Sequence, residues 1–222
     1  ALRDLRAVLA AALLGAAWLV PGSAAADAPG RAARLSDVTG DVQLANARED
    51  WHPIGRNFVV TAGDSLWVAE GGRAELDAGG SMLWLDGGSN VSIDQLDDGV
   101  WTVRLMQGAM AVRTRAYVEG RGADQVRVLT SYGELGLLRP GFYTARAGYG
   151  PIDGNSGYAP VVLTVRRGAA DVASRNTVQT VNAGSTAVLD AVGVRYDRNW
   201  PVASGSFEAW ASARDRRMEQ WL

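Results

Sequence analysis

The chain has 222 residues, of which 47% are hydrophobic and 21% charged, and its formal net charge is -2. This composition is typical of a globular protein and excludes a disordered tail or a strongly basic nucleic-acid binder, so we expect no nucleic acid among its partners. All 22 basic residues are arginine and cysteine is absent, which excludes disulfide and thiolate chemistry.

The first segment in chain order is an apolar run that ends in small residues. Residues 7–20 carry no charge, but the run is too short to span a bilayer comfortably, and Pro21 ends it. Ala24 and Ala26 then stand at the small-residue positions of a cleavage site. The pattern predicts a secretory signal peptide over 1–26, and so a periplasmic or secreted protein with no stable membrane span after cleavage near Ala26. The weaker alternative is a buried N-terminal helix.

Short alternating runs separated by glycine follow a Pro/Gly linker at 27–34. Between residues 73 and 115, polar and apolar residues alternate with the period of a strand that has one wet face. Asp98-Gly99, between two such runs, is the strongest hairpin signal. Turns recur about every eight to twelve residues, which is the rhythm of an antiparallel sandwich or barrel.

One hairpin pattern recurs along the chain. Residues 38–42 and 60–65 resemble residues 165–172 and 181–186, and residues 105–112 contain a third copy of the hairpin. Repeats of this kind indicate stacked β-units. We therefore predict an all-β fold, either an antiparallel sandwich or a short solenoid-like stack of β-hairpins.

The end of the chain changes period. Residues at a spacing of three or four form one helical stripe: Phe207, Trp210, Arg214, Met218 and Trp221. A connector and a C-terminal amphipathic α-helix are therefore predicted over 193–222, after a β-domain over 35–192. We expect the stripe to pack on the β-domain or on missing downstream sequence rather than on a partner, because amphipathic helices usually bury their apolar face within their own chain.

Gly63-Asp64-Ser65-Leu66 spells the nucleophile block of the GDSL esterases. A serine in that chemistry needs a histidine base, itself oriented by an aspartate. The only histidine, His52, lies upstream, and no Asp-x-x-His follows. We therefore predict no catalytic residues and a protein that is not an enzyme, and keep a GDSL-type hydrolase as a remote alternative.

Metal and cofactor signals are equally weak. Asp94, Asp97 and Asp98 could surround calcium, but hairpin tips favour Asp for turn chemistry. His52 alone cannot build a zinc site, which needs three or four ligands. No phosphate-binding or dinucleotide-binding loop occurs on a strand–helix junction. The sequence thus predicts no metal and no cofactor.

The aromatic residues give the one candidate binding site. Tyr149 and Tyr158 lie near the ends of a Gly/Pro-rich loop over 147–160. Aromatic side chains in such loops more often contact a partner or a sugar, so both are predicted to bind a partner. Tryptophans in expected strands are assigned to the core or to a sheet face: Trp67, Trp84 and Trp101.

Several short stretches, in their order and spacing, resemble the FecR-type periplasmic domain, and most closely the exported FecR-domain proteins of proteobacteria. They are residues 35–42, 59–68 (VVTAGDSLWV), 72–76 (GRAEL), 83–85 (LWL), 103–112 (VRLMQGAMAV) and 137–143 (LLRPGFY). In those proteins a segment like residues 207–217 (FEAWASARDRR) leads into a Trp-rich tail. The resemblance covers roughly residues 32–217 and implies that a Trp-rich C-terminal region is missing, so we expect a truncated chain or a short variant.

The resemblance also implies a role. In FecR itself, the periplasmic part senses a siderophore receptor and a cytoplasmic part controls a sigma factor. Because no cytoplasmic segment precedes the leader here, only the domain type carries over: a non-catalytic β-module for protein interaction or ligand sensing in the bacterial envelope. We expect an envelope protein as partner, bound by edge-strand addition or through the Tyr149–Tyr158 loop. The alternative is a carbohydrate-binding or peptidoglycan-binding module, with a cell-wall polymer as partner.

Overall fold

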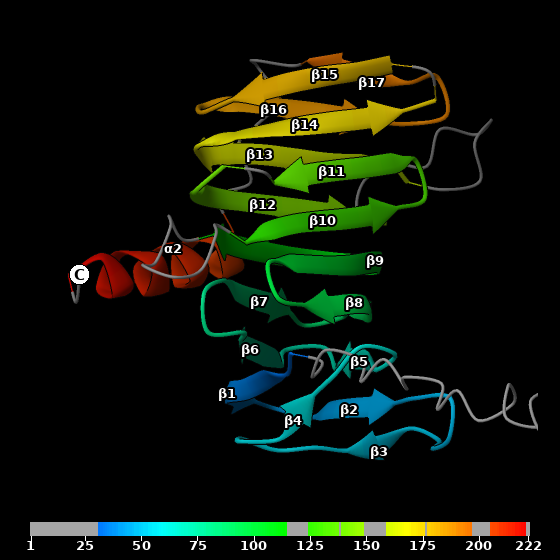
Figure 1. Ribbon diagram of the computed structural model, residues 1–222, viewed down its shortest axis with the longest axis vertical. Helices are drawn as coiled ribbons and strands as arrows, with labels where there is room; N and C mark the ends of the chain where they lie inside the picture. Colours follow the sequence, from blue (N-terminus) through cyan, green and yellow to red (C-terminus); the bar gives the residue numbers. More distant parts are fainter. Residues whose placement is uncertain are drawn as a thin grey trace, which may run out of the picture.

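The structure, a computed structural model, describes residues 31–114, 124–137, 139–148, 159–175, 177–196 and 205–220. Short strands are stacked along the long axis of the molecule in two layers, and one helix lies against the side of this stack (Figure 1). The predicted all-β fold with a C-terminal helix is confirmed. The expected signal peptide and the first half of the linker lie outside the described residues.

Two sheets, A and B, form the layers. Sheet A contains, in order of pairing, β4 (Val59–Val60), β1 (Ala33–Thr39), β6 (Arg73–Asp77), β7 (Met82–Asp86), the second half of β9 (Val100–Thr114), β12 (Gly141–Ala147), β13 (Val161–Arg167), β16 (Ser185–Leu189) and β17 (Val194–Tyr196). Sheet B contains β3 (His52–Pro53), β2 (Val42–Ala45), β5 (Ser65–Val68), β8 (Asn90–Asp97), the first half of β9, β10 (Gln125–Thr130), β11 (Gly133–Leu137), β14 (Ala169–Ser174) and β15 (Thr177–Asn182). Every described pair is antiparallel except β9 with β10.

The long strand β9 belongs to both sheets. It bends from one to the other at Gly108, whose φ of 99° favours glycine. A Cβ at this position would lie 2.3 Å from the Cα of Ser89, so no larger residue fits without a shift. The Ser89 hydroxyl donates to the Ala109 carbonyl (2.9 Å) and accepts from the Ala109 N–H (3.0 Å), which fixes the crossing.

The core lies between the sheets. Alternate residues of each strand point inward, as the period of two requires, and they are almost all aliphatic. Trp101 is buried in this core, Trp84 is buried on the outer face of sheet A, and Trp67 is half-buried in β5. The assignment of these tryptophans to core or sheet face is confirmed.

The helix α2 (Ser206–Glu219) covers the outer face of sheet A. Its residues Phe207 and Ala211 pack on apolar side chains of three strands: Met82, Trp84, Ala109, Ala111 and Phe142. The prediction that the stripe packs on the β-domain is confirmed for its described members, but its centre is shifted. The most buried line runs through Phe207, Ala211 and Asp215, while Trp210 and Arg214 are half-buried beside it. Trp221 lies outside the described residues.

Among the described residues, no helix combines the length and the apolar character that crossing a membrane requires.

Candidate functional site at the open end of the stack

The partner-binding residues predicted from the sequence, Tyr149 and Tyr158, lie outside the described residues. The structure therefore leaves untested the prediction that this loop binds a partner. The other sequence candidates can be placed.

Ser65 and His52 are not brought together. Ser65 lies in β5, whose neighbour β2 separates it from His52 in β3. Two strand spacings amount to about 9–10 Å, which is far beyond hydrogen-bond reach. The Asp64 carboxylate accepts from the Thr61 N–H (2.7 Å) and hydroxyl (3.0 Å), so it closes a turn and does not orient a base.

Two of the three aspartates near the β8–β9 hairpin are bonded to neighbouring side chains. Asp94 pairs with Arg104 and accepts from the Ser92 hydroxyl (2.7 Å), and Asp97 accepts from the Gln95 amide (2.6 Å). Across the described segments, no group of three or more His, Asp or Glu side chains could hold a metal ion.

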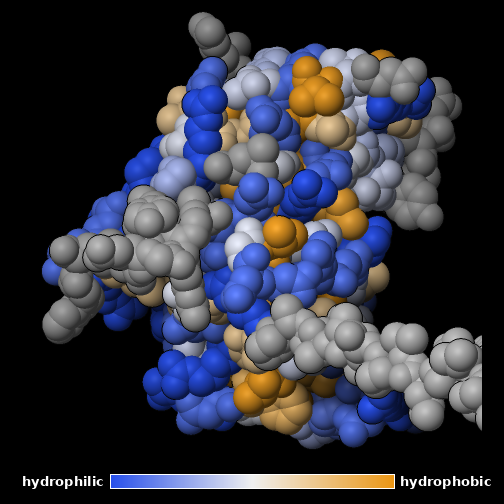
Figure 2. Space-filling view, viewed as in Figure 1, coloured by the Kyte–Doolittle hydropathy of each residue, from blue (hydrophilic) through white to orange (hydrophobic). Residues whose placement is uncertain are grey.

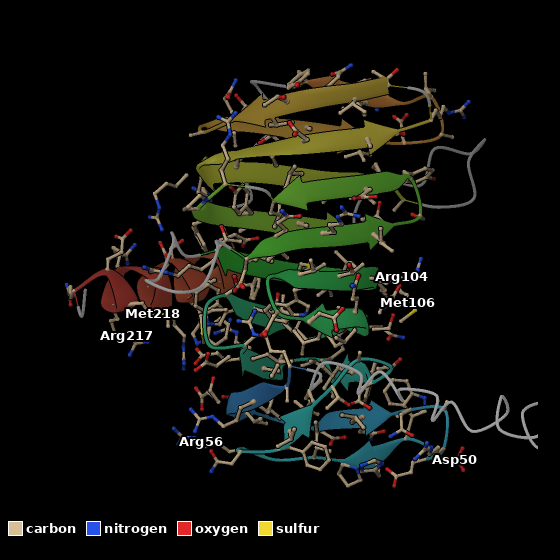
Figure 3. The ribbon with its side chains drawn as sticks, in the orientation of Figure 1. Asp50, Arg56, Arg104, Met106, Arg217 and Met218 are labelled. Carbon is tan, nitrogen blue, oxygen red and sulfur yellow. The ribbon has the colours of Figure 1, made fainter. Side chains whose placement is uncertain are left out.

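The lower end of the stack, formed by β3 and β4, is capped. Both strands have two residues, and Pro53 in β3 has no N–H to offer. The Arg56 side chain, which extends from this end (Figure 3), donates to the Ser36 carbonyl (2.8 Å), and the Asn57 N–H donates to the Leu35 carbonyl (2.7 Å). Short strands, a proline and a charged side chain on the edge are features that prevent further strand pairing.

The upper end, formed by β15 and β17, has none of these features on β15. This strand runs for six residues, Thr-Val-Gln-Thr-Val-Asn, without a charge or a proline. In the described part of the chain it pairs only with β14, so its other edge has no strand beside it. Such a strand presents a row of unpaired N–H and C=O groups.

Tyr196 shows which main-chain groups face the open edge. Its hydroxyl donates to the Thr180 carbonyl (2.5 Å), so the Thr180 main chain points away from β14. In an antiparallel pair, alternate residues point the same way, and Val178 therefore also directs its N–H and C=O outward. Burial first, and then the Asp171 carboxylate, raise the pKa of Tyr196, which keeps the phenol protonated as a donor.

Exposed apolar side chains gather at this end. Val178 is 70% exposed, Val192 85% and Tyr196 48%. Figure 2 shows hydrophobic surface at the upper end, and also in the middle and at the lower end of the same face. A single exposed valine is ordinary, but three exposed apolar residues beside an unpaired strand edge form a candidate contact surface.

The turn before β17 holds Tyr196 in place. The Asp190 carboxylate accepts from the Val192 N–H (2.8 Å) and the Gly193 N–H (3.2 Å), and it pairs with Arg195. Burial alone would raise the pKa of Asp190, but these hydrogen bonds, led by that of Val192, outweigh it and lower the pKa.

Sequence reasoning expected edge-strand addition without naming a strand. The signal that could have named it is the composition of residues 177–182, which combine β-branched residues with no charge. Whether such a strand is central or at an edge depends on where the stack ends, and the local sequence does not determine this.

Comparisons with known proteins add little. No family model and no curated protein sequence matches this chain. Two crystal structures of a "putative anti-sigma factor" from Parabacteroides distasonis are similar in part, with 14% and 13% sequence identity and a TM-score of 0.45 each. Each match covers 60% of this chain and 58% of the length of that protein.

Proposed function

We propose that this protein is a non-catalytic recognition module of the bacterial envelope, of the FecR-type periplasmic kind, which binds a protein partner at the upper end of its stack. The observation that carries the proposal is β15, a six-residue uncharged strand with a partner on one side only among the described residues. A protein that avoids strand pairing at one end and leaves the other end open has a surface suited to recognition.

The FecR-like stretches support the domain type. Residues 59–68 cover β4 and β5, residues 72–76 cover all but the last residue of β6, and residues 103–112 lie within β9. They coincide with consecutive strands of the stack, so the resemblance concerns the scaffold. The exported location rests on the predicted leader, and N-terminal sequencing of protein recovered from the periplasm should find a start near Asp27.

A second candidate function is binding of a cell-wall carbohydrate. Trp51 and Phe58 favour it, because they are 46% and 37% exposed near the lower end, and aromatic rings are common sugar contacts. This surface is separate from the upper end, so the two candidates can be distinguished by position.

Site-specific photo-crosslinking tests the proposal. A photoreactive phenylalanine analogue replaces Val178 at the upper end, or Asp50 at the lower end as the matched exposed control. We expect an adduct with one envelope protein from position 178 and none from position 50. Sedimentation with purified cell walls that is lost in Trp51→Ala would contradict the proposal and support the carbohydrate alternative.

A further inference from the structure

The open edge of β15 presents main-chain N–H and C=O groups that can form hydrogen bonds with another extended chain. Val178 and Thr180 direct both N–H and C=O toward the open edge of β15. The Thr180 carbonyl already accepts from Tyr196, but a carbonyl oxygen has a second lone pair. An alternating row of donors and acceptors at strand spacing is matched by the backbone of another extended chain.

The side chains around this edge select apolar neighbours on both faces. Val178 pairs with Ala173 of β14 on the outer face of sheet B. Tyr196 pairs with the buried Ala187, so its ring lies on the inner side, at the end of the core. An added strand would therefore place alternate side chains against Val178 outside and Tyr196 inside, where β-branched and other apolar residues fit best.

Charged side chains near the edge already have hydrogen-bond or ion-pair partners within the molecule. Asp171 accepts from the Thr180 hydroxyl (2.7 Å), Asp190 pairs with Arg195, and Arg175 donates to the Ala191 carbonyl. A charged incoming side chain would lose its own hydration and would have to compete with these bonds for a partner. The surroundings thus favour an uncharged occupant.

A second copy of this chain fits the edge poorly. The capped lower end cannot continue the sheet of a neighbouring copy, because Pro53 and Arg56 occupy its edges. Pairing of two upper ends would join two six-residue strands. An edge of that length alone buries well below the roughly 1,200 Å² of a stable dimer, so self-pairing is treated as an outcome of the test.

We infer that β15 binds an extended, uncharged, β-branched segment of a partner protein, which adds to sheet B as its next strand. The inference rests on the proposed function and specifies how the partner is held. Main-chain hydrogen bonds supply affinity, and the contacts of alternate side chains with Val178 and Tyr196 supply selectivity.

The probe is a fluorescein-labelled peptide, Gly-Ser-Thr-Val-Thr-Val-Thr-Val-Gly-Ser, measured by fluorescence anisotropy with the full chain. We expect saturable binding that is abolished when alternate peptide nitrogens are methylated, because methylation removes the donors on one edge. A peptide with glutamate in place of every threonine should bind at least about tenfold more weakly, since it brings unpaired charge to the edge.

Val178→Pro is the decisive variant. It removes an outward N–H and leaves the β14–β15 ladder intact, because the Val178 N–H does not face β14. We expect peptide affinity to fall about tenfold or more, because the loss of one hydrogen bond and the weakening of its neighbours correspond to a change of that size. The melting temperature should not change. Val178→Ala, which keeps the N–H, is the control and should lose less. Equal binding by Val178→Pro and the unsubstituted chain would overturn the inference.

Amide hydrogen exchange gives a second readout that does not depend on a variant. The Val178 and Thr180 amides should exchange fast in the free protein and slow down with the peptide, while those of residues 51–60 stay unchanged. If both amides are protected without peptide and the protein sediments as a dimer in analytical ultracentrifugation, the edge is paired with a second copy, and the inference is wrong. If position 178 crosslinks to an envelope partner but the peptide protects neither amide, the proposed function is supported and the inferred strand addition is contradicted.

Discussion

At the scale of the residue, Gly108, where β9 changes sheets, leaves no room for a larger side chain. Gly108→Ala would place a Cβ 2.3 Å from the Ser89 Cα and strain a φ of 99°. We expect a loss of at least about 3 kcal/mol of unfolding free energy, measured by urea denaturation. Gly99→Ala is the matched control, because its φ of 84° is also positive but nothing lies within 4 Å. It should lose only about 1–2 kcal/mol. Equal losses would mean that the contact with Ser89 is irrelevant.

A second prediction at this scale concerns Asp190. Its pKa is lowered from 3.8, because hydrogen bonds outweigh the effect of burial. A carboxylate with a lowered pKa stabilises the fold above the unfolded-state pKa of about 3.9, and this stabilisation is lost as the pH falls through the folded-state value. Asp190→Asn should therefore cost about 1–2 kcal/mol at pH 7, and the difference should shrink below about pH 4. Urea denaturation at pH 7, 5 and 3 measures it, and a gap that does not vary with pH would contradict it.

At the scale of the element, α2 is fixed to sheet A by ion pairs as well as by apolar contacts. Asp215 pairs with Arg113 at 2.9 Å, and both side chains are only 6% exposed. Arg214 pairs with Glu75 and Asp37; burial acts against its charge, but these partners outweigh burial and raise its pKa. Met218 and Arg217, labelled in Figure 3, mark the far end of this helix.

Removing one member of the buried pair should be severe. Asp215→Ala leaves the Arg113 guanidinium buried without its carboxylate, which we expect to cost about 3–5 kcal/mol. The control is Glu219→Ala, whose pair with Arg167 is 45% exposed on both sides, and which should cost about 0–1 kcal/mol. Thermal denaturation followed by tryptophan fluorescence compares the two variants, and similar effects would show that the pair at Asp215 is not a determinant of helix docking.

The strands and the helix could be predicted because their signals are local. The alternation over residues 73–77, the Asp98-Gly99 turn and the spacing of Phe207 and Trp210 are each read within a few consecutive positions. The assignment of each strand to sheet A or B could not be predicted, because the crossing at Gly108 depends on Ser89 in a different segment. For the same reason the local sequence does not show that Asp215 faces the sheet. Only the folded sheet brings Arg113 beneath it.

At the scale of the whole molecule, the structure is nearly one-dimensional. Each strand contacts mainly the strands above and below it, so stability should be distributed as a sum over neighbouring levels. β9 pairs with four strands, β7, β8, β10 and β12, and so joins the two sheets at the middle of the stack. In the described chain, β3, β4, β15 and β17 each pair with one strand only.

This arrangement predicts a gradient of local stability from the middle to both ends. Amide hydrogen exchange should be slowest in β9 and its neighbours, where opening requires the loss of pairing on both sides in both sheets. It should be fastest in β15 and β17, because β17 has only three residues and β15 pairs along one edge only in the described chain. At the lower end, Arg56 and Asn57 add hydrogen bonds from the β3–β4 loop to β1. Mass-spectrometric exchange over seconds to hours measures the profile. Uniform protection along the stack would mean that it unfolds as one cooperative unit, and the open edge would then be as rigid as the core.

A strand that frays at one end can pair with an incoming chain without disturbing the rest, so the same profile also decides whether β15 can accept a partner at low energetic cost.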